Sequence, residues 1–401
     1  YIFLLIITFM VIFNGGNNNL YIQFNFIIIS FFFLFFIREK NYLAHVREIF
    51  STNKLAITLY LLFISFLIFQ TIPLPIEWLS FLSPEKYNFL NKLEFDGNFN
   101  FISLNPVNSF FSILNYLSLF LYLIIFKSLF YKNKHIIEFY YFLVFLGAFA
   151  ASVAIYFYLI GNPDFLIIKN IKKSAATGFF INRTVFSCFL TLCFFSGIEY
   201  LKMIDHYQKN NTDTFFNKIY VRIFLLLITI AIITTFSKLG NFLFISLIIM
   251  YISQALYKND KKDRFFLITL ILIVLFDVLI LGFYFGSEKL LQRYSFLQSE
   301  INEYLPSSAQ SFLSRADLTK FAFIEFKKFI LFGYGGGGFE YLFKINFQNL
   351  SKSFAINAHS DFFEFIGEFG LIGSTLISLS LLFSCANKDF LSFKNFLLCY
   401  L

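Results

Sequence analysis

Residues 136–160 read IIEFYYFLVFLGAFAASVAIYFYLI, an apolar run interrupted by a single charged residue, Glu138. A helix rises about 1.5 Å per residue and the hydrocarbon core of a bilayer is about 30 Å thick, so about 20 apolar residues cross it. The run is therefore long enough to span a membrane as one helix.

The same pattern recurs along the whole chain. Hydrophobic residues make up 58% of the 401 residues and charged residues only 14%. A soluble domain of this length cannot bury so much apolar surface in its core. We therefore expect ten apolar spans and the start of an eleventh, with approximate bounds 1–13, 20–37, 54–72, 108–126, 136–160, 179–200, 221–236, 239–257, 264–285, 362–385 and 390–401. The chain begins at Tyr1 and ends at Leu401 inside apolar runs, so we expect the first and last spans to be truncated.

Lysine and arginine indicate the orientation, because cytoplasmic loops of membrane proteins are enriched in both. Four alternate loops, 38–54, 127–135, 201–222 and 258–264, together carry fifteen basic residues, whereas the loops between them carry seven. The first set is therefore predicted to be cytoplasmic, and the long segment 286–361 is predicted to lie on the outer face.

These observations predict an all-α fold, a polytopic transmembrane helical bundle with one large outer loop. We divide the chain into a bundle of about nine spans (1–285), the outer loop with an interfacial helix (286–361) and C-terminal transmembrane helices (362–401). Within the loop, Ser314 is a candidate cap for a helix from about Arg315 to Ile330.

Four basic or titratable residues are expected at the outer interface. Arg183 begins a span, Lys238 lies in a tight turn between two spans, Arg315 opens the loop helix and His359 closes the loop. Imidazole accepts a proton at neutral pH, and arginine binds phosphate through two hydrogen bonds. The set suits attack by a hydroxyl on a carbon that bears a diphosphate leaving group, a reaction that needs no metal and no cofactor. The alternative is that His359 is an ordinary polar residue at a helix end and that Arg183 and Lys238 are membrane anchors.

Carboxylates follow His359 along the next helix. Asp361 or Glu364 could orient the imidazole. Metal binding is not indicated there, because no second histidine is near. The four cysteines all lie in apolar segments, which indicates neither a disulfide framework nor a zinc site.

Two further features leave alternatives open. The segment Gly333-Tyr334-Gly335-Gly336-Gly337-Gly338 matches G-x-G-x-x-G, but no βαβ unit surrounds it. We interpret it as a flexible turn, with an anion nest as the alternative. Asp277 lies within the expected span 264–285, where it could mark a proton or ion path, and this is the main support for a transporter. The preferred alternative is that Asp277 forms a hydrogen bond with a hydroxyl of a neighbouring helix. No internal repeat accompanies it.

Several motifs resemble those of one family. They are Ser314-Arg315, Leu331-Phe332-Gly333-Tyr334-Gly335, Ala358-His359-Ser360-Asp361, Gly367-Glu368-Phe369-Gly370-Leu371-Ile372-Gly373 and, upstream, Gly178-Phe179-Phe180-Ile181-Asn182-Arg183. From about Ala176 to Gly373, the chain resembles the O-antigen ligase and polymerase superfamily of bacterial envelope glycosyltransferases. The segment Thr234-Thr235-Phe236-Ser237-Lys238 stands where that family usually has Ser-Arg-Gly.

The resemblance implies a GT-C-like helical fold and a metal-independent glycosyltransferase of the bacterial inner membrane, active on its periplasmic side. The donor would be a glycan on undecaprenyl diphosphate, and the acceptor a hydroxyl of lipid A-core, of another glycan or of a protein. His359 would be the base, and Arg183, Arg315 and Lys238 would bind the diphosphate. Other expected partners are membrane lipids, and the net charge of +8 needs no nucleic acid. The alternatives are a polysaccharide polymerase and, from other classes, a transporter of lipid-linked sugars or a non-catalytic binder of the carrier lipid.

Overall fold

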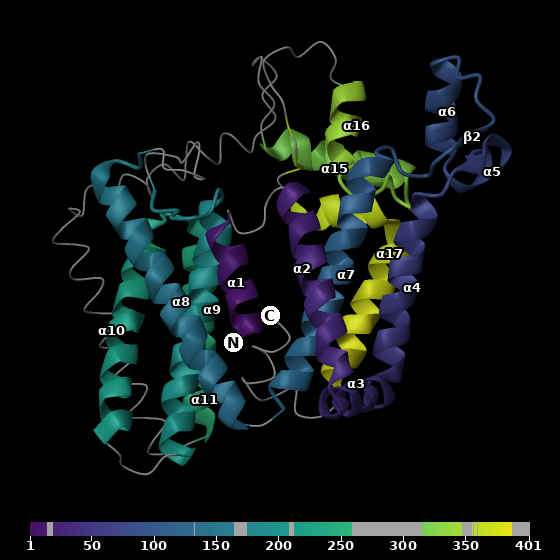
Figure 1. The fold of residues 1–401 in the computed structure, drawn as a ribbon. Coiled ribbons are helices and arrows are strands. Elements are labelled where there is room, and N and C mark those ends of the chain that lie inside the picture. Colours follow the sequence, from purple (N-terminus) through teal and green to yellow (C-terminus); the bar gives the residue numbers. More distant parts are fainter. Residues whose placement is uncertain are drawn as a thin grey trace. The chain divides into compact units, whose positions relative to one another are not determined.

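Most of the chain folds into helices in the computed structural model (Figure 1). The structure describes residues 1–13, 19–131, 133–163, 175–207, 212–258, 315–346, 355, 357–358 and 360–386. These residues form two compact units. The first unit contains the described residues of 1–28 and 126–291, and the second those of 29–125 and 292–399.

Six of the described helices are long and apolar enough to cross a membrane. They are α2 (Asn19–Arg38), α7 (Pro106–Leu129), α8 (Asn133–Ile160), α9 (Arg183–Tyr207), α10 (Thr212–Thr234) and α17 (Asp361–Ala386). A bent pair, α3 (Lys40–Thr52) with α4 (Lys54–Gln70), raises the number to seven if it counts as one span. The prediction of an all-α polytopic membrane protein is confirmed. The expected spans 264–285 and 390–401 lie outside the described residues.

The first unit also holds two further apolar helices, α1 (Ile2–Ile12) and α11 (Lys238–Lys258), and the apolar part of α11 is the shorter stretch Lys238–Ser253. In this unit α8, α9 and α10 pack against one another, and α11 packs against α9. Glycines bring these helices close together, because a Cβ atom on Gly147 of α8 would meet Cys193 of α9. Likewise a Cβ atom on Gly197 of α9 would lie 2.8 Å from Leu225 of α10. Small residues at helix contacts are typical of membrane bundles.

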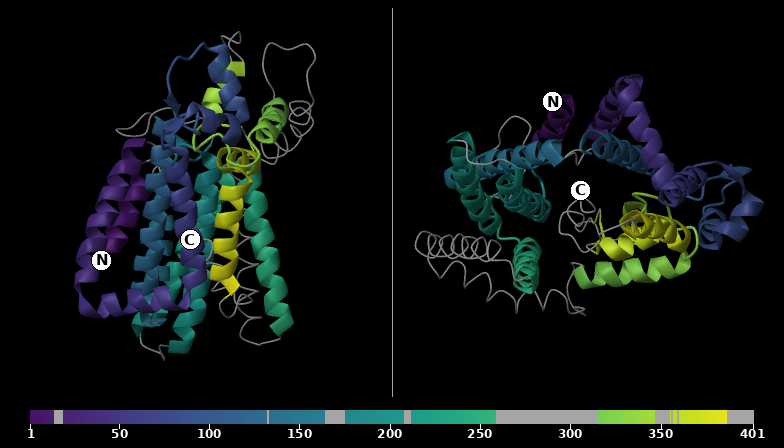
Figure 2. Two further views of the ribbon diagram at one scale, coloured as in Figure 1. Left: turned by 90° about the vertical axis from the view of Figure 1, so that its right-hand side faces the viewer. Right: turned by 90° about the horizontal axis from the view of Figure 1, so that it is seen from below.

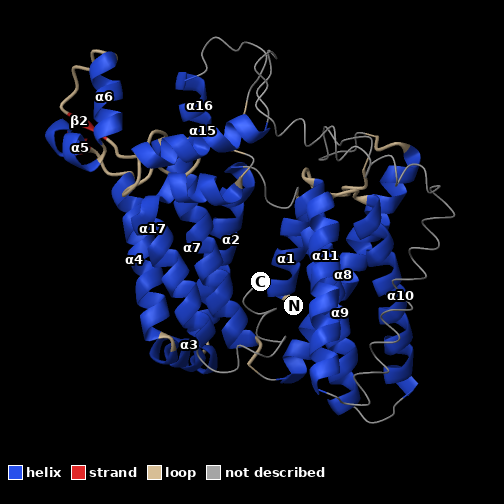
Figure 3. Cartoon of the chain, turned by 180° about the vertical axis from the view of Figure 1, so that it is seen from behind, coloured by secondary structure: helices blue, strands red, loops and turns tan. Residues whose placement is uncertain are grey.

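In the second unit, α4 packs along α17 (Figure 3). Phe63 of α4 meets Phe369 of α17 edge to face, with ring centroids 5.6 Å apart. Near the other end of the pair, Ser380 donates a hydrogen bond to the Ala56 carbonyl at 2.8 Å. The contact therefore extends along most of α4.

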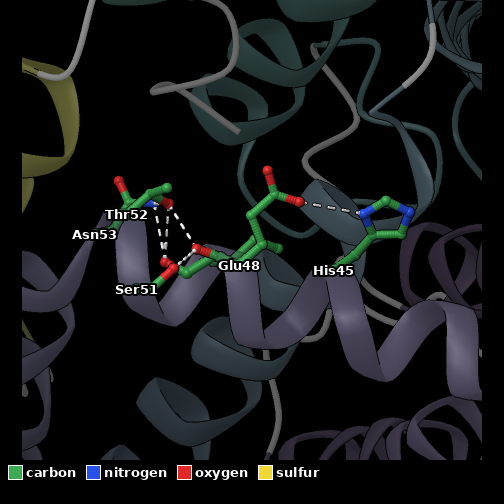
Figure 4. Close-up of polar contacts among 6 residues, drawn as sticks. His45, Glu48, Ser51, Thr52 and Asn53 are labelled. Atoms are coloured by element: carbon green, nitrogen blue, oxygen red, sulfur yellow. Dashed lines mark hydrogen bonds and ion pairs between the residues drawn. The ribbon is translucent and has the colours of Figure 1, made fainter.

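The predicted loop 38–54 contains a helix, α3, that meets α4 at 90°. Figure 4 shows polar contacts along its last turns, where the hydroxyls of Ser51 and Thr52 donate to the Glu48 carbonyl at 2.8 and 2.9 Å. His45 lies 3.6 Å from Glu48 in the same helix. An amphipathic helix of this kind suits a position along a membrane surface. Such a helix carries many charged residues, which explains why the sequence of 38–54 was interpreted as a loop.

The remaining elements of the second unit gather beyond the end of α4 at Gln70, opposite α3 (Figure 1). We call this end of the unit the loop end. It contains β1 (Leu74–Pro75), α5 (Ile76–Leu82), α6 (Pro84–Lys92), β2 (Phe99–Asn100), α15 (Arg315–Lys328) and α16 (Phe339–Asn346). The two short strands are antiparallel, with Leu74 opposite Asn100. The helix predicted from Arg315 to Ile330 is observed as α15, and its predicted cap, Ser314, lies outside the described residues.

Candidate functional site

Two of the predicted cations begin neighbouring helices in the first unit. Arg183 is the first residue of α9, and Lys238 is the first residue of α11 rather than a turn residue. The side chain just before each cation caps its helix. Asn182 accepts the Thr184 N–H at 2.8 Å, and Ser237 accepts the Gly240 N–H at 3.2 Å.

A hydrogen bond joins the two helix starts. The hydroxyls of Thr184 and Ser237 lie 2.9 Å apart, and Gly240 approaches Ser187 so closely that any Cβ atom would collide. The structure thus brings Arg183 and Lys238 to one end of the first unit, where both side chains are half-buried. A helix N-terminus carries a partial positive charge, so two starts and two cations together favour an anion.

The segment before α9 packs against the same end. The Ala176 N–H donates to the Thr234 carbonyl at the end of α10, 3.1 Å away. Gly178 has φ 54°, a conformation that favours glycine, and a Cβ atom there would lie 3.0 Å from Ala154 of α8. Gly178 therefore allows the segment that leads to Arg183 to pack closely against α8.

At the loop end of the second unit, the glycine-rich turn 333–338 packs against a break in α17. Gly370 interrupts that helix with φ 62° and ψ −174°. Backbone hydrogen bonds join the two segments, from Tyr334 to Gly367 at 3.0 Å, from Gly335 to Glu368 at 2.9 Å and from Leu371 to Ile330 at 2.8 Å. The turn predicted from the glycines is therefore a fixed part of the second unit.

Two side chains that the sequence analysis gave no role hold this turn. Glu368 accepts the Gly337 N–H through its carboxylate at 2.7 Å. Gln70, at the end of α4, donates to the carbonyls of Phe332 and Glu368, at 2.5 and 3.1 Å. Glu368 belongs to the Gly367–Gly373 motif but was assigned no role there, and no pattern marked Gln70.

Tyr334 fills the centre of the turn and is fully buried. Burial raises the pKa of its phenol well above the ordinary value, and the carboxylates of Glu368, Glu364 and Glu325 raise it further. The phenol therefore stays protonated at all physiological pH values.

The predicted base, His359, lies outside the described residues, but both of its chain neighbours are described. Ala358 is buried, and its N–H donates to a carboxylate oxygen of Glu364 at 2.8 Å. Asp361, the other predicted orienting residue, is exposed at the first position of α17. Glu364 thus holds the backbone next to His359. Arg315 begins α15, and the structure does not describe its side chain.

Among the described residues, no group of three or more His, Cys, Asp or Glu side chains is arranged to hold a metal ion. The predicted site residues whose side chains are described belong to different units. Arg183 and Lys238 belong to the first, and Asp361 and Glu364 to the second.

Residues 223–378 match the profile of a protein family described as O-antigen ligase. The matched region includes Lys238, Arg315, His359, Asp361 and Glu364, and Arg183 precedes it. Neither a curated protein nor a solved structure matches the chain. The match over residues 223–378 thus supports the O-antigen ligase superfamily for this part of the chain.

Proposed function

We propose that this chain is a membrane glycan transferase of the O-antigen ligase type. It transfers an oligosaccharide or polysaccharide from a polyprenyl diphosphate carrier to an acceptor hydroxyl at the periplasmic face of the bacterial inner membrane. The observation that carries the proposal is the family domain at 223–378, which contains Lys238, Arg315 and His359 within a chain of bilayer-length helices.

The proposed reaction is a single displacement at the anomeric carbon of the donor sugar. His359 takes the proton from the acceptor hydroxyl as the acceptor oxygen forms its bond to that carbon. The bond between the carbon and the diphosphate oxygen breaks, and the polyprenyl diphosphate leaves with the electron pair. No electrons are exchanged with a third compound, so the step needs no redox cofactor.

The leaving diphosphate gains negative charge, which cations and helix N-termini stabilise. Arg183 and Lys238 start helices that the Thr184–Ser237 hydrogen bond joins, and this supports their assignment as diphosphate ligands. Arg315 is the third proposed ligand. Arginine offers two parallel hydrogen bonds to a phosphate, whereas lysine acts as a point charge.

Glu364 is proposed as a positioning residue. Its carboxylate accepts the N–H of Ala358, so it restrains the peptide that leads into His359. A base must stay within hydrogen-bond reach of the proton that it abstracts, so a restrained backbone improves the reaction.

The test is complementation of a bacterium that lacks its own O-antigen ligase. The chain, His359→Ala and His45→Ala would be expressed at equal levels, and lipopolysaccharide separated on a gel. His45 is the matched control, because it lies on α3 at the opposite end of the second unit from the loop end. We expect a ladder with the chain and with His45→Ala, and none with His359→Ala.

The other outcomes are also decisive. A ladder with His359→Ala would remove His359 as the base while keeping ligation. With no ladder from any correctly inserted protein, the same set would be expressed in a strain that lacks its O-antigen polymerase. Restored chain length there would replace the ligase assignment with polymerase, and failure in both strains would overturn glycan transfer.

A further inference from the structure

Helix α5 presents aromatic side chains outward from the second unit. Trp78 is 61% exposed and Phe81 is 86% exposed, although both are large and apolar. Trp78 is the only tryptophan of the 401 residues. Positions three apart share a face of a helix, so these two side chains form one aromatic strip along α5.

The aromatic strip lies between two others with the same spacing. On one side, Glu77 and Ser80 are exposed and polar. On the other side, Leu79 is fully buried and Leu82 is half-buried, in a cluster with Leu74 and Ile102. Helix α5 is thus attached to the protein along one strip, polar along another and apolar but uncovered along the strip between them. This order is typical of a helix that lies in a membrane interface.

Exposed apolar side chains also lie along α4, the helix that precedes α5. Leu61, Leu62 and Ile68 are exposed along that span, and Ile72 is exposed just beyond it. Helix α5 begins at Ile76, six residues after α4 ends at Gln70. Phe69, near the end of α4, packs against the cluster that contains Leu79, so α5 lies beside the end of α4. Seen from below, the segment with α5 and α6 extends outward past α4 at the edge of the unit (Figure 2, right).

We propose that α5 is an interfacial helix whose Trp78 and Phe81 insert among the lipids of the outer leaflet, beside the end of α4. The partner is the lipid surface itself. Tryptophan prefers the headgroup level of a bilayer, because its ring is apolar and its N–H still reaches water or a headgroup. Lipid contact also covers the two apolar side chains that the described part of the chain leaves exposed.

Insertion of α5 would fix the depth of the glycine-rich turn. The helix continues into α6, whose buried Lys86 donates to the Ser103 carbonyl at 2.6 Å. The next residue, Leu104, donates its N–H to the Tyr334 carbonyl at 2.9 Å. The segment from α5 to residue 104 therefore connects the lipid surface to the turn through direct hydrogen bonds. This inference does not depend on the proposed transferase activity.

The single tryptophan makes the test direct. The chain would be placed in phosphatidylcholine nanodiscs, where water reaches both faces, and its fluorescence would be measured with lipids that carry a quencher near the headgroup or near the chain end. Iodide would report contact with water. Trp78→Phe gives the blank, and two tryptophans in that background give controls. Asn88→Trp is on the exposed side of α6, and Leu62→Trp is on the lipid side of α4.

We expect Trp78 to respond most to the quencher near the headgroup, and less to iodide than Asn88→Trp does. Leu62→Trp should respond more to the quencher near the chain end. If iodide reaches Trp78 as readily as Asn88→Trp and labelled lipid has no effect, the strip faces water and the inference is wrong. If neither iodide nor a labelled lipid quenches Trp78, a protein surface covers that side chain, and this result would also overturn lipid insertion.

Discussion

At the scale of single residues, Lys238 is the clearest test of diphosphate binding. Removing a hydrogen bond to a charged group costs about 1.5–3 kcal/mol, and each 1.4 kcal/mol is about a factor of ten. Lys238→Ala should therefore raise the KM for the lipid-linked donor by about 10- to 100-fold in a purified transfer assay, whereas Lys238→Arg should keep most activity. Lys127→Ala, an exposed cation of the same unit, is the control. Equal effects of the alanine changes at 127 and 238 would argue against a diphosphate site.

Glu364 and Asp361 were predicted as alternatives, and the Ala358 hydrogen bond favours Glu364. Loss of that bond frees a buried N–H, at a cost of about 1–3 kcal/mol. We expect Glu364→Ala to lower kcat by about tenfold or more with the donor KM nearly unchanged, and Glu364→Gln, which retains an acceptor oxygen, to recover part of the loss. Asp361→Ala should leave kcat close to that of the parent. The reverse pattern would assign the orienting role to Asp361.

At the scale of elements, the turn 333–338 depends on its glycines through space as well as backbone conformation. Gly335 has φ 87°, and a Cβ atom there would collide with Ser103. Gly161 offers a matched control, since its φ is 90° but nothing lies within 4 Å of an added Cβ atom. Left-handed backbone costs alanine about 1–2 kcal/mol, and overpacking adds about 1–3 kcal/mol. Thermal unfolding in detergent should therefore show Gly335→Ala to be less stable than Gly161→Ala. Equal melting temperatures would show that the turn yields to the added methyl group.

Lys86 of α6 gives the loop end a predicted pH dependence. Burial lowers the pKa of its ammonium group from 10.5 to about 7. At a pH between these two values, the unfolded chain binds a proton that the folded chain does not. The free energy of unfolding should therefore increase as the pH rises from about 7 towards 10.5. The slope should be at most about 1.4 kcal/mol per pH unit. Lys86→Met should remove this part of the slope when melting temperature is measured against pH. A slope unchanged by that substitution would contradict the assignment.

At the scale of the whole molecule, the sequence predicted the membrane-spanning helices well, because lipid imposes a simple requirement for length and apolarity. The sequence did not predict α3. The charged residues of 38–54 were interpreted as a loop, but they belong to a helix that is bent by 90° from α4. The roles of Gln70 and Glu368 were also missed. Gln70 meets the Phe332 carbonyl across 262 residues of sequence, and contacts between such distant segments leave no local pattern. The topology predicted that Arg183 and Lys238 lie at the same end of the helices, but it could not predict the hydrogen bond between Thr184 and Ser237.

The orientation of the chain is the last prediction, because every proposed role depends on it. The loop end and α3 lie at opposite ends of the second unit, so a membrane should separate them (Figure 1). Basic residues gather around α3 at Arg38, Lys40, Arg47 and Lys54, which predicts that α3 faces the cytoplasm. In a cysteine-free background, a cysteine at Asn88 of α6 should react in intact cells with a thiol reagent that cannot cross the inner membrane. A cysteine at Ser51 of α3 should react only after lysis. Both positions are exposed, so access to the reagent decides the result. Labelling of Ser51 but not Asn88 would invert the chain and exclude transfer at the periplasmic face, while leaving the helix packing unchanged.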